Sequence, residues 1–203
     1  MSTAARFAVV KAALFVLSLA PVGFFTAAIL GGGVAEPVAF LTRETGEQAL
    51  RFLLITLAMT PLRLASGWSG FIKLRRMFGL FAFFYALCHF GVYVFLDLQL
   101  DFAAVVDDII RRKYITVGFA ALVLLLPLAL TSNSWSIKRL GARKWSKLHR
   151  AVYVIALLAP IHFLWQERGE DLTEPLVYLG LMIALLALRV PLLANRLTLL
   201  RRG

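Results

Sequence analysis

Three histidines are the side chains through which this chain could do redox chemistry. His89 and His162 each lie within a long apolar segment, and His149 opens the segment that contains His162. An ionisable side chain inside a bilayer is costly and by default indicates a functional site. Imidazole nitrogens serve as axial ligands of heme iron. The placement of these residues therefore predicts heme ligation inside a membrane.

The elements that must position these histidines are membrane-spanning helices. Hydrophobic residues make up 61% of the 203 residues, charged residues make up 16%, and the mean hydropathy is +0.82. A helix needs roughly 20 mostly apolar residues to cross the hydrocarbon core. Suitable segments are residues 7–30, 46–64, 76–96, 113–131, 149–165 and 172–194. The sequence thus predicts an all-α integral membrane protein, a bundle of six transmembrane helices that forms a single domain over residues 1–203.

The basic residues indicate how this bundle is oriented. The chain has 22 basic and 11 acidic residues, which gives a net charge of +11. Most basic residues fall near the termini and in two connections, between the second and third segments and between the fourth and fifth. Basic connections of this kind stay on the cytoplasmic side of a membrane. We therefore expect both termini in the cytoplasm, and we attribute the charge to membrane orientation rather than to nucleic-acid binding.

The predicted topology brings His89 and His162 to the same depth. The third and fifth segments run in the same direction. His89 stands 13 residues after Arg76, and His162 stands 13 residues after His149. Side chains on facing helices of a bundle can hold a cofactor between them. We therefore predict that both rings bind one heme iron from opposite sides, toward the outer half of the membrane.

His149 leaves open a second heme nearer to the cytoplasm. It lies about 20 Å from His162 along the helix axis, at about 1.5 Å per residue. Arg75, 14 residues before His89, stands where an opposing ligand is needed. An inner heme therefore requires Arg75, water or another residue opposite His149. A spacing of 13 also puts His149 and His162 on different faces of a regular helix, unless Pro160 kinks the helix or His149 frays from its start.

Two further patterns each fit two interpretations. The third segment is rich in aromatic rings, and Gly79 and Gly91 leave gaps beside them, which suits either a flat macrocycle or ordinary helix packing. Apolar residues recur at helical spacing between the third and fourth segments, at Phe102, Val105, Val106, Ile109 and Ile110. That connection is either a short helix on the outer membrane interface or a solvated loop.

Several motifs resemble those of a known family. The most specific is Trp-Ser-Lys-Leu-His-Arg at residues 145–150, followed by Tyr153 and then by His162. The likeness extends over nearly the whole chain, through residues 51–76, 86–89, 130–133 and 162–165. Together these motifs resemble the MsrQ family, the heme-binding membrane subunits of bacterial periplasmic methionine-sulfoxide reductase systems.

This resemblance implies a cofactor, a location and partners. The family is similar to the transmembrane domain of ferric reductases and NADPH oxidases, in which two helices each carry two heme-ligating histidines. His89, His149 and His162 match three of these positions. Arg75 stands at the fourth, so the chain is compatible with one heme or two. The resemblance further implies a bacterial inner-membrane subunit that passes electrons from the quinone pool through heme b to a periplasmic molybdenum-containing reductase, which repairs methionine sulfoxide in proteins. Noncovalent FMN is implied by the resemblance alone.

The expected mechanism is one-electron transfer to the bound heme from a quinol near Arg75, Arg76 and His149. The chain has no G-x-G-x-x-G motif, so we expect an electron-transfer subunit without a nicotinamide-oxidising module or a reductase active site of its own. Two other functions also fit the composition, a stand-alone ferric or metal reductase cytochrome and a small proton-conducting transporter that uses histidines. The second is disfavoured because no Asp or Glu occurs in the middle of any predicted segment.

Overall fold

The structure of the chain is a computed structural model that describes residues 2–167 and 171–189. Over these residues every regular element is a helix, so the predicted all-α fold is confirmed. The elements are α1 (Thr3–Leu30), α2 (Pro37–Ser66), α3 (Gly70–Gly91), the π-helix η1 (Val92–Asp97), α4 (Phe102–Arg111), α5 (Lys113–Leu130), α6 (Ser134–His149), α7 (Ala151–Gln166) and α8 (Thr173–Ala187).

Several helices are long and apolar enough to cross a membrane. In the described part of the chain there are five such stretches, Thr3–Leu30, Pro37–Ser66, Gly70–Asp97, Lys113–Leu130 and Ser134–Gln166. The apolar helix α8 has 15 residues, short of the roughly 20 that a span requires. Residues 190–194 of the predicted sixth span lie outside the described residues. The chain is thus a multi-pass membrane protein, and the count of six spans stays a prediction.

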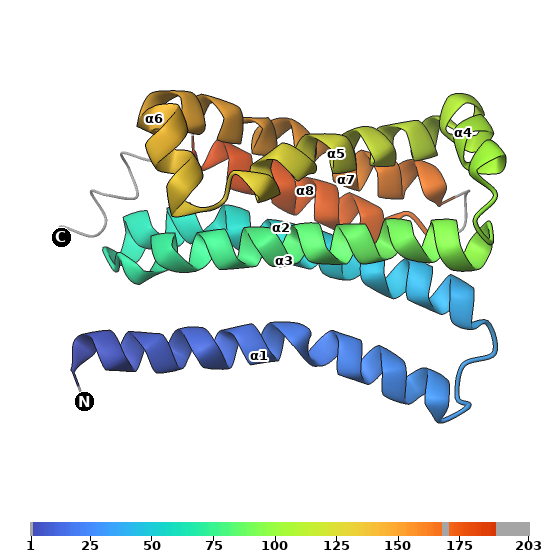
Figure 1. Ribbon diagram of the computed structural model, residues 1–203, viewed down its shortest axis with the longest axis horizontal. Helices are drawn as coiled ribbons and strands as arrows, with labels where there is room; N and C mark the ends of the chain where they lie inside the picture. Colours follow the sequence, from blue (N-terminus) through green and yellow to red (C-terminus); the bar gives the residue numbers. More distant parts are fainter. Residues whose placement is uncertain (1, 168–170, 190–203) are drawn as a thin grey trace.

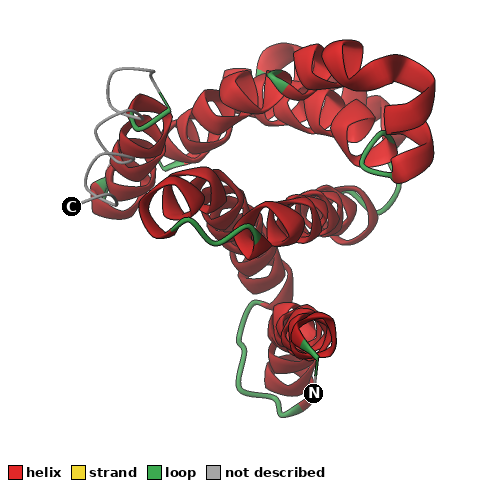
Figure 2. Ribbon diagram, turned by 90° about the vertical axis from the view of Figure 1, so that its left-hand side faces the viewer, coloured by secondary structure: helices red, strands yellow, loops and turns green. Residues whose placement is uncertain are grey.

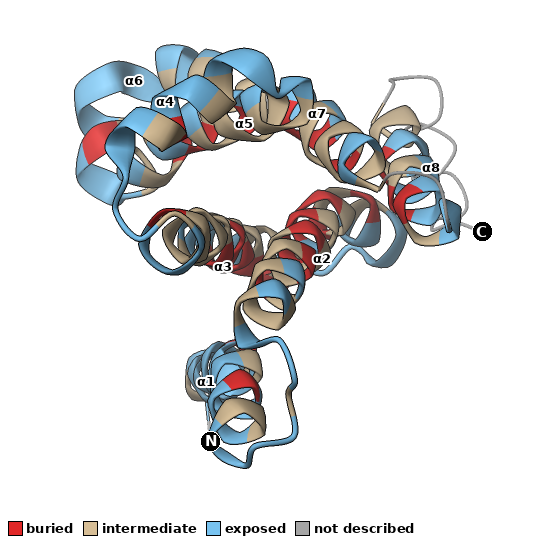
Figure 3. Cartoon of the chain, turned by 90° about the vertical axis from the view of Figure 1, so that its right-hand side faces the viewer, coloured by how far each residue is buried: buried red, intermediate tan, exposed pale blue. Residues whose placement is uncertain are grey.

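The helices form two layers, with α1 outside them (Figure 1). α2 and α3 pack side by side in one layer, and α5, α7 and α8 form the other. α3 contacts α5 and α2 contacts α8, so the layers meet along both edges. Seen from either end, these five helices form a ring, and α1 lies beyond α2 and α3 (Figure 2 and Figure 3).

α3 and α7 run in the same direction, as expected (Figure 1). Both begin at the end of the molecule that holds the N-terminus, the α2–α3 connection and α6, which we name the inner end. The opposite end holds residues 31–36 and α4, and we name it the outer end. Because the basic connections lie at the inner end, the positive-inside rule predicts that this end faces the cytoplasm.

Stacked aromatic rings hold α1, α2 and α3 together. Phe52 on α2 stacks on Phe81 and Tyr85 of α3, with ring centres 5.4 Å apart in both pairs. Tyr85 is fully buried, and its hydroxyl donates to the backbone carbonyl of Ser18 on α1 at 2.7 Å. Between helices in a membrane, such packing and hydrogen bonds replace the hydrophobic effect as the main attraction.

The glycine gaps expected in the third segment serve helix packing. A Cβ at Gly79 would meet the Thr56 side chain of α2 at 3.5 Å, and one at Gly91 would meet Phe95 at 3.8 Å. Both are ordinary van der Waals distances within and between helices. These contacts fit the helix-packing interpretation, and neither glycine lines the cavity described below.

The connection between the third and fourth spans contains the helix α4. Asp101 caps it by accepting a hydrogen bond from the backbone N–H of Ala104 at 3.0 Å. Phe102 and Ile110 are exposed, whereas Val105 is buried against the protein. The helical interpretation of this connection is confirmed, and its position on a membrane interface stays a prediction.

The basic connection before the fifth span is helical too. α6 starts after Asn133, whose side chain accepts a backbone N–H bond at 2.8 Å. It bends at Gly141, where φ is +76°, a conformation that glycine adopts without strain. α6 ends at His149, and α7 begins at Ala151. His149 thus lies two residues before α7, close to the predicted start of the fifth span at residue 149.

Candidate cofactor site

A cavity of about 390 Å³ lies between the two layers. α2 and α3 line one side of it, and α5 and α7 line the other. His89 of α3 and His162 of α7 both face this cavity. Its apolar lining includes Leu50, Leu53, Ala82, Ala86, Leu122 and Leu125. An apolar cavity with a few converging polar groups is typical of cofactor pockets.

The two imidazoles are spaced as ligands of one metal ion. The centres of the His89 and His162 rings are 6.0 Å apart, and the ring planes are inclined by 79°. An imidazole nitrogen binds a transition-metal ion at about 2.1 Å and lies about 1.2 Å from its own ring centre, so two rings on opposite sides of one ion would have centres about 6.6 Å apart. The observed separation fits a shared iron within about half an ångström.

Backbone carbonyls fix which nitrogen of each ring carries the proton. His89 Nδ1 lies 2.8 Å from the carbonyl oxygen of Thr42 on α2, and His162 Nδ1 lies 2.7 Å from that of Tyr114 on α5. A carbonyl oxygen can only accept, so each neutral ring donates from Nδ1. The lone pair is then on Nε2, the nitrogen free to bind a metal. Metal-binding histidines commonly have such a partner on the other nitrogen.

A glycine allows each ring to approach its carbonyl. Gly46 follows Thr42 by one helical turn, and Gly118 follows Tyr114 in the same way. A Cβ at Gly46 would lie 3.1 Å from His89 Nδ1, and a Cβ at Gly118 would lie 2.6 Å from His162 Nδ1. The same carbonyl and glycine arrangement therefore supports both histidines, from α2 and from α5.

Comparisons with known proteins place the chain in a family. Residues 45–160 match the family described as ferric reductase like transmembrane component. The chain is 45% identical over 183 residues to the protein-methionine-sulfoxide reductase heme-binding subunit MsrQ of Herminiimonas arsenicoxydans, covering 89% of this chain and 84% of that protein. The chain belongs to the MsrQ family. The MsrQ subunits of Rhodospirillum rubrum and Bordetella pertussis are 45% and 48% identical, covering 92% and 89% of this chain and 90% and 88% of theirs. The resemblance inferred from the motifs is confirmed.

In this MsrQ family member, His149 and Arg75 lie apart from the cavity. Neither residue contributes to its lining. His149 Nε2 lies 3.0 Å from Thr131 Oγ1, and its ring stacks on Trp145 with centres 3.9 Å apart. Arg75 donates from Nη1 to Thr60 Oγ1 at 3.2 Å. The structure therefore brings two of the four predicted site residues together, and the other two stay near the inner end.

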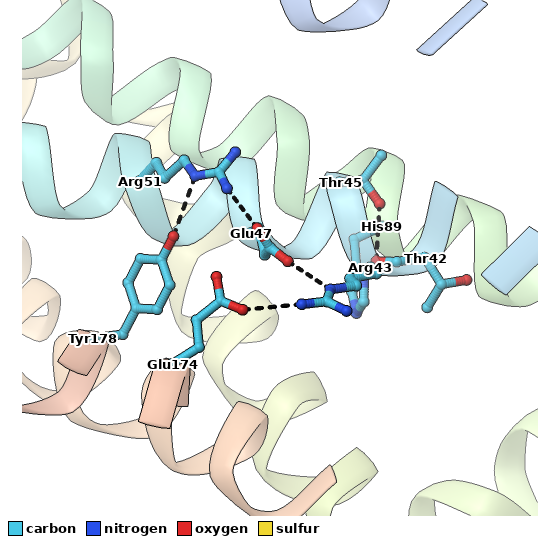
Figure 4. Close-up of polar contacts among 8 residues, drawn as sticks. All are labelled: Thr42, Arg43, Thr45, Glu47, Arg51, His89, Glu174 and Tyr178. Carbon is cyan, nitrogen blue, oxygen red and sulfur yellow. Dashed lines mark hydrogen bonds and ion pairs between the residues drawn. The ribbon is translucent and has the colours of Figure 1, made fainter. Parts of the chain in front are cut away.

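A buried carboxylate beside the cavity escaped the sequence interpretation. Glu47 is only 5% exposed and accepts from Arg43 at 2.8 Å and from Arg51. Arg43 also donates to Glu174 of α8 at 3.0 Å, and Arg51 donates to the Tyr178 hydroxyl at 3.2 Å (Figure 4). The MsrQ fold thus ties α2 to α8 through these five residues, the α2–α8 ion-pair cluster. The cluster was missed because α2 begins well before residue 46.

Replacing Glu47 by glutamine is expected to lower the unfolding temperature. Loss of a partner from a fully buried ion pair costs about 3–5 kcal/mol. Because the Arg43 and Arg51 side chains are 63% and 41% exposed, we expect about 2 kcal/mol at most here. The matched control is Asp107→Asn, which breaks an exposed pair with Arg111. Tryptophan fluorescence of the detergent-solubilised protein measures both, and equal unfolding temperatures would contradict a stabilising role for Glu47.

Proposed function

We propose that this chain binds heme b and transfers single electrons for the reduction of methionine sulfoxide in proteins. Its relatives are named heme-binding subunits of protein-methionine-sulfoxide reductase. The observation that carries the proposal is the pair of imidazoles 6.0 Å apart in a largely apolar cavity. In each ring the Nδ1–H group donates to a backbone carbonyl, of Thr42 or of Tyr114, which leaves Nε2 free to bind iron.

In this assignment the Nε2 atoms of His89 and His162 would hold the heme iron. A heme bound between them supplies one-electron oxidation and reduction at a single metal ion. Two histidines that hold the iron would leave it no free position for a substrate, so the site suits electron transfer rather than catalysis at the metal. The carbonyls of Thr42 and Tyr114 hold the Nδ1 protons, and the apolar walls exclude water.

We further propose that electrons enter from a quinol at the inner end and leave at the outer end. Arg75, Arg76 and His149 are the polar groups that favour a quinol headgroup near the inner surface. The cavity reaches Arg112 and Glu167 near the outer end. This position suits delivery to a molybdenum-containing reductase in the periplasm of a bacterium, with the chain in the inner membrane, as the family implies.

Replacing Arg75 by glutamine together with His149 by alanine is expected to slow quinol-dependent heme reduction. We expect a loss of about tenfold, equivalent to about 1.4 kcal/mol of barrier, with an unchanged spectrum of the heme proposed between His89 and His162. Stopped-flow absorption at the Soret band, with a reduced quinol added to protein in vesicles, measures the rate. Arg143→Gln, which removes an exposed inner-end charge on α6, serves as the control. An unchanged rate in the double variant would remove the basis for this quinol site.

A second heme at His149 and a bound FMN stay predictions. His149 Nε2 is engaged by Thr131 in this structure, and Arg75 by Thr60. The heme-to-protein ratio, determined as pyridine hemochrome, tests the second heme. A ratio that falls by half in His149→Ala supports it, and an unchanged ratio argues for a single heme. Flavin fluorescence of the denatured purified protein tests for FMN.

The same purified protein separates this function from its two rivals. A stand-alone metal reductase would reduce external ferric chelates at full rate without any protein partner. A proton-conducting transporter would purify without a Soret band. We expect a heme-containing protein whose turnover depends on a soluble methionine-sulfoxide reductase subunit and its oxidised protein substrate.

A further inference from the structure

The charges of this chain are segregated between the two ends of the molecule. All 11 acidic residues fall within residues 36–47, 97–108 and 167–174. In the structure, the start of α2, the helix α4 and the start of α8 lie at the outer end (Figure 1). Among the described residues, the inner end therefore has basic side chains but no acidic side chain to pair with them.

Two arginines at the inner end converge on one stretch of α2. Arg189 Nη2, just after α8, donates to the backbone carbonyl of Leu57 at 2.8 Å. Arg75 Nη1 of α3 donates to Thr60 Oγ1 at 3.2 Å. Positions three residues apart on a helix are neighbours, about 5–6 Å from each other. The two guanidinium groups, from α3 and from the end of α8, are thus brought close together.

These two arginines differ from the other basic residues of the inner end. Arg63 and Arg76 are exposed, as are most basic residues of α6, so water and lipid headgroups can solvate them. Arg75 and Arg189 are partly buried, and the Nε of Arg189 is fully buried with no hydrogen-bond partner among the described residues. The ion pairs found in the described chain involve neither of them. Membrane orientation requires basic residues at this end but does not require two of them to be partly buried against the same stretch of α2.

A buried guanidinium group normally has an anion as partner. It carries five N–H donors, and each of these two uses one in the hydrogen bonds above. Charged groups removed from water are costly unless they are paired. None of the described residues at this end has an acidic side chain, so a bound anion is the partner that fits these unused donors.

We propose that Arg75 and Arg189 bind a phosphate group at the inner end of the bundle. Planar guanidinium groups match the oxygens of phosphate with paired hydrogen bonds, which a lysine pair cannot do. Basic pockets between membrane helices on the cytoplasmic side bind anionic lipid headgroups. The phosphate belongs either to an anionic phospholipid of the inner leaflet or to a soluble phosphate compound. This inference does not depend on heme binding by His89 and His162.

Binding is tested by thermal unfolding of the full-length, detergent-solubilised protein with added anions. The probes are phosphatidylglycerol, diacylglycerol with the same acyl chains, and inorganic phosphate against chloride at equal ionic strength. We expect phosphatidylglycerol or phosphate to raise the unfolding temperature of the wild type. The apparent dissociation constant should weaken at least tenfold in Arg189→Gln and in Arg75→Gln, and it should stay unchanged in the control Arg143→Gln.

The outcomes distinguish the two sources of phosphate, and some of them would contradict the proposed site. Stabilisation by phosphatidylglycerol alone identifies a lipid headgroup, and equal stabilisation by inorganic phosphate identifies a soluble compound. The proposal is wrong if neither probe stabilises the wild type, or if Arg143→Gln loses as much affinity as the two site variants. Should a glutamine variant fail to fold, Arg189→Lys takes its place. Lysine keeps the positive charge but lacks the planar set of N–H donors of arginine. Unchanged affinity in Arg189→Lys would contradict the proposal. The Soret band, recorded on the same samples, reports separately on the heme site.

Discussion

Replacing either His89 or His162 by alanine is expected to abolish the six-coordinate heme. Each substitution removes one of the two imidazoles whose rings lie 6.0 Å apart across the cavity. The remaining imidazole can bind iron from one side only. We therefore expect either loss of most bound heme on purification or a shift of the residual heme to a high-spin absorption spectrum.

Absorption spectra and pyridine hemochrome content of the purified variants measure this effect. His149→Ala is the control, because His149 does not line the cavity and contacts Thr131 and Trp145 instead. The low-spin heme between α3 and α7 should persist in that variant. A wild-type Soret band in both His89→Ala and His162→Ala would refute the ligand assignment.

Gly118→Ala is expected to disturb the site nearly as strongly as loss of a ligand. The new Cβ would lie 2.6 Å from His162 Nδ1, closer than any non-bonded contact allows. The ring must then move away from the carbonyl of Tyr114, which holds its proton. We expect most bound heme to be lost, and a smaller loss for Gly46→Ala, where the Cβ would lie 3.1 Å from His89 Nδ1.

Gly180→Ala is the matched control for these glycine variants. Gly180 also lies within a helix, α8, and a Cβ there would meet nothing within 4 Å. Its heme content and unfolding temperature should equal those of the wild type. If Gly118→Ala retains the wild-type heme content and reduction potential, the close contact with His162 does not position the ligand.

The sequence was sufficient to predict the histidine pair because depth in a membrane follows from counting residues. Equal spacing from the inner surface along two parallel helices places His89 and His162 at one level. The 13-residue spacing, which would put His149 and His162 on different faces of one regular helix, also has a physical explanation. His149 ends α6 and Arg150 forms a turn, so the two histidines do not belong to one uninterrupted α-helix.

The supporting groups could not be predicted in the same way. The carbonyls of Thr42 and Tyr114 and their glycines belong to α2 and α5, and their role depends on how those helices are rotated about their axes. Backbone carbonyls leave no residue-type signal in a sequence. The signal in the sequence is a glycine one turn after the carbonyl residue, in α2 and in α5. It can be interpreted only when it is known that α2 packs beside His89 and α5 beside His162. Burial of Glu47 likewise depended on where α2 begins, which hydropathy places too late.

The most direct test of the central claim is the low-temperature electron paramagnetic resonance spectrum of the ferric wild-type protein. The rings of His89 and His162 are inclined by 79°, and two nearly perpendicular imidazoles on one iron give a strongly anisotropic low-spin signal. The account predicts that signal for the heme between α3 and α7. A spectrum that contains only high-spin iron would mean that an axial position is open, and it would contradict ligation by these two histidines.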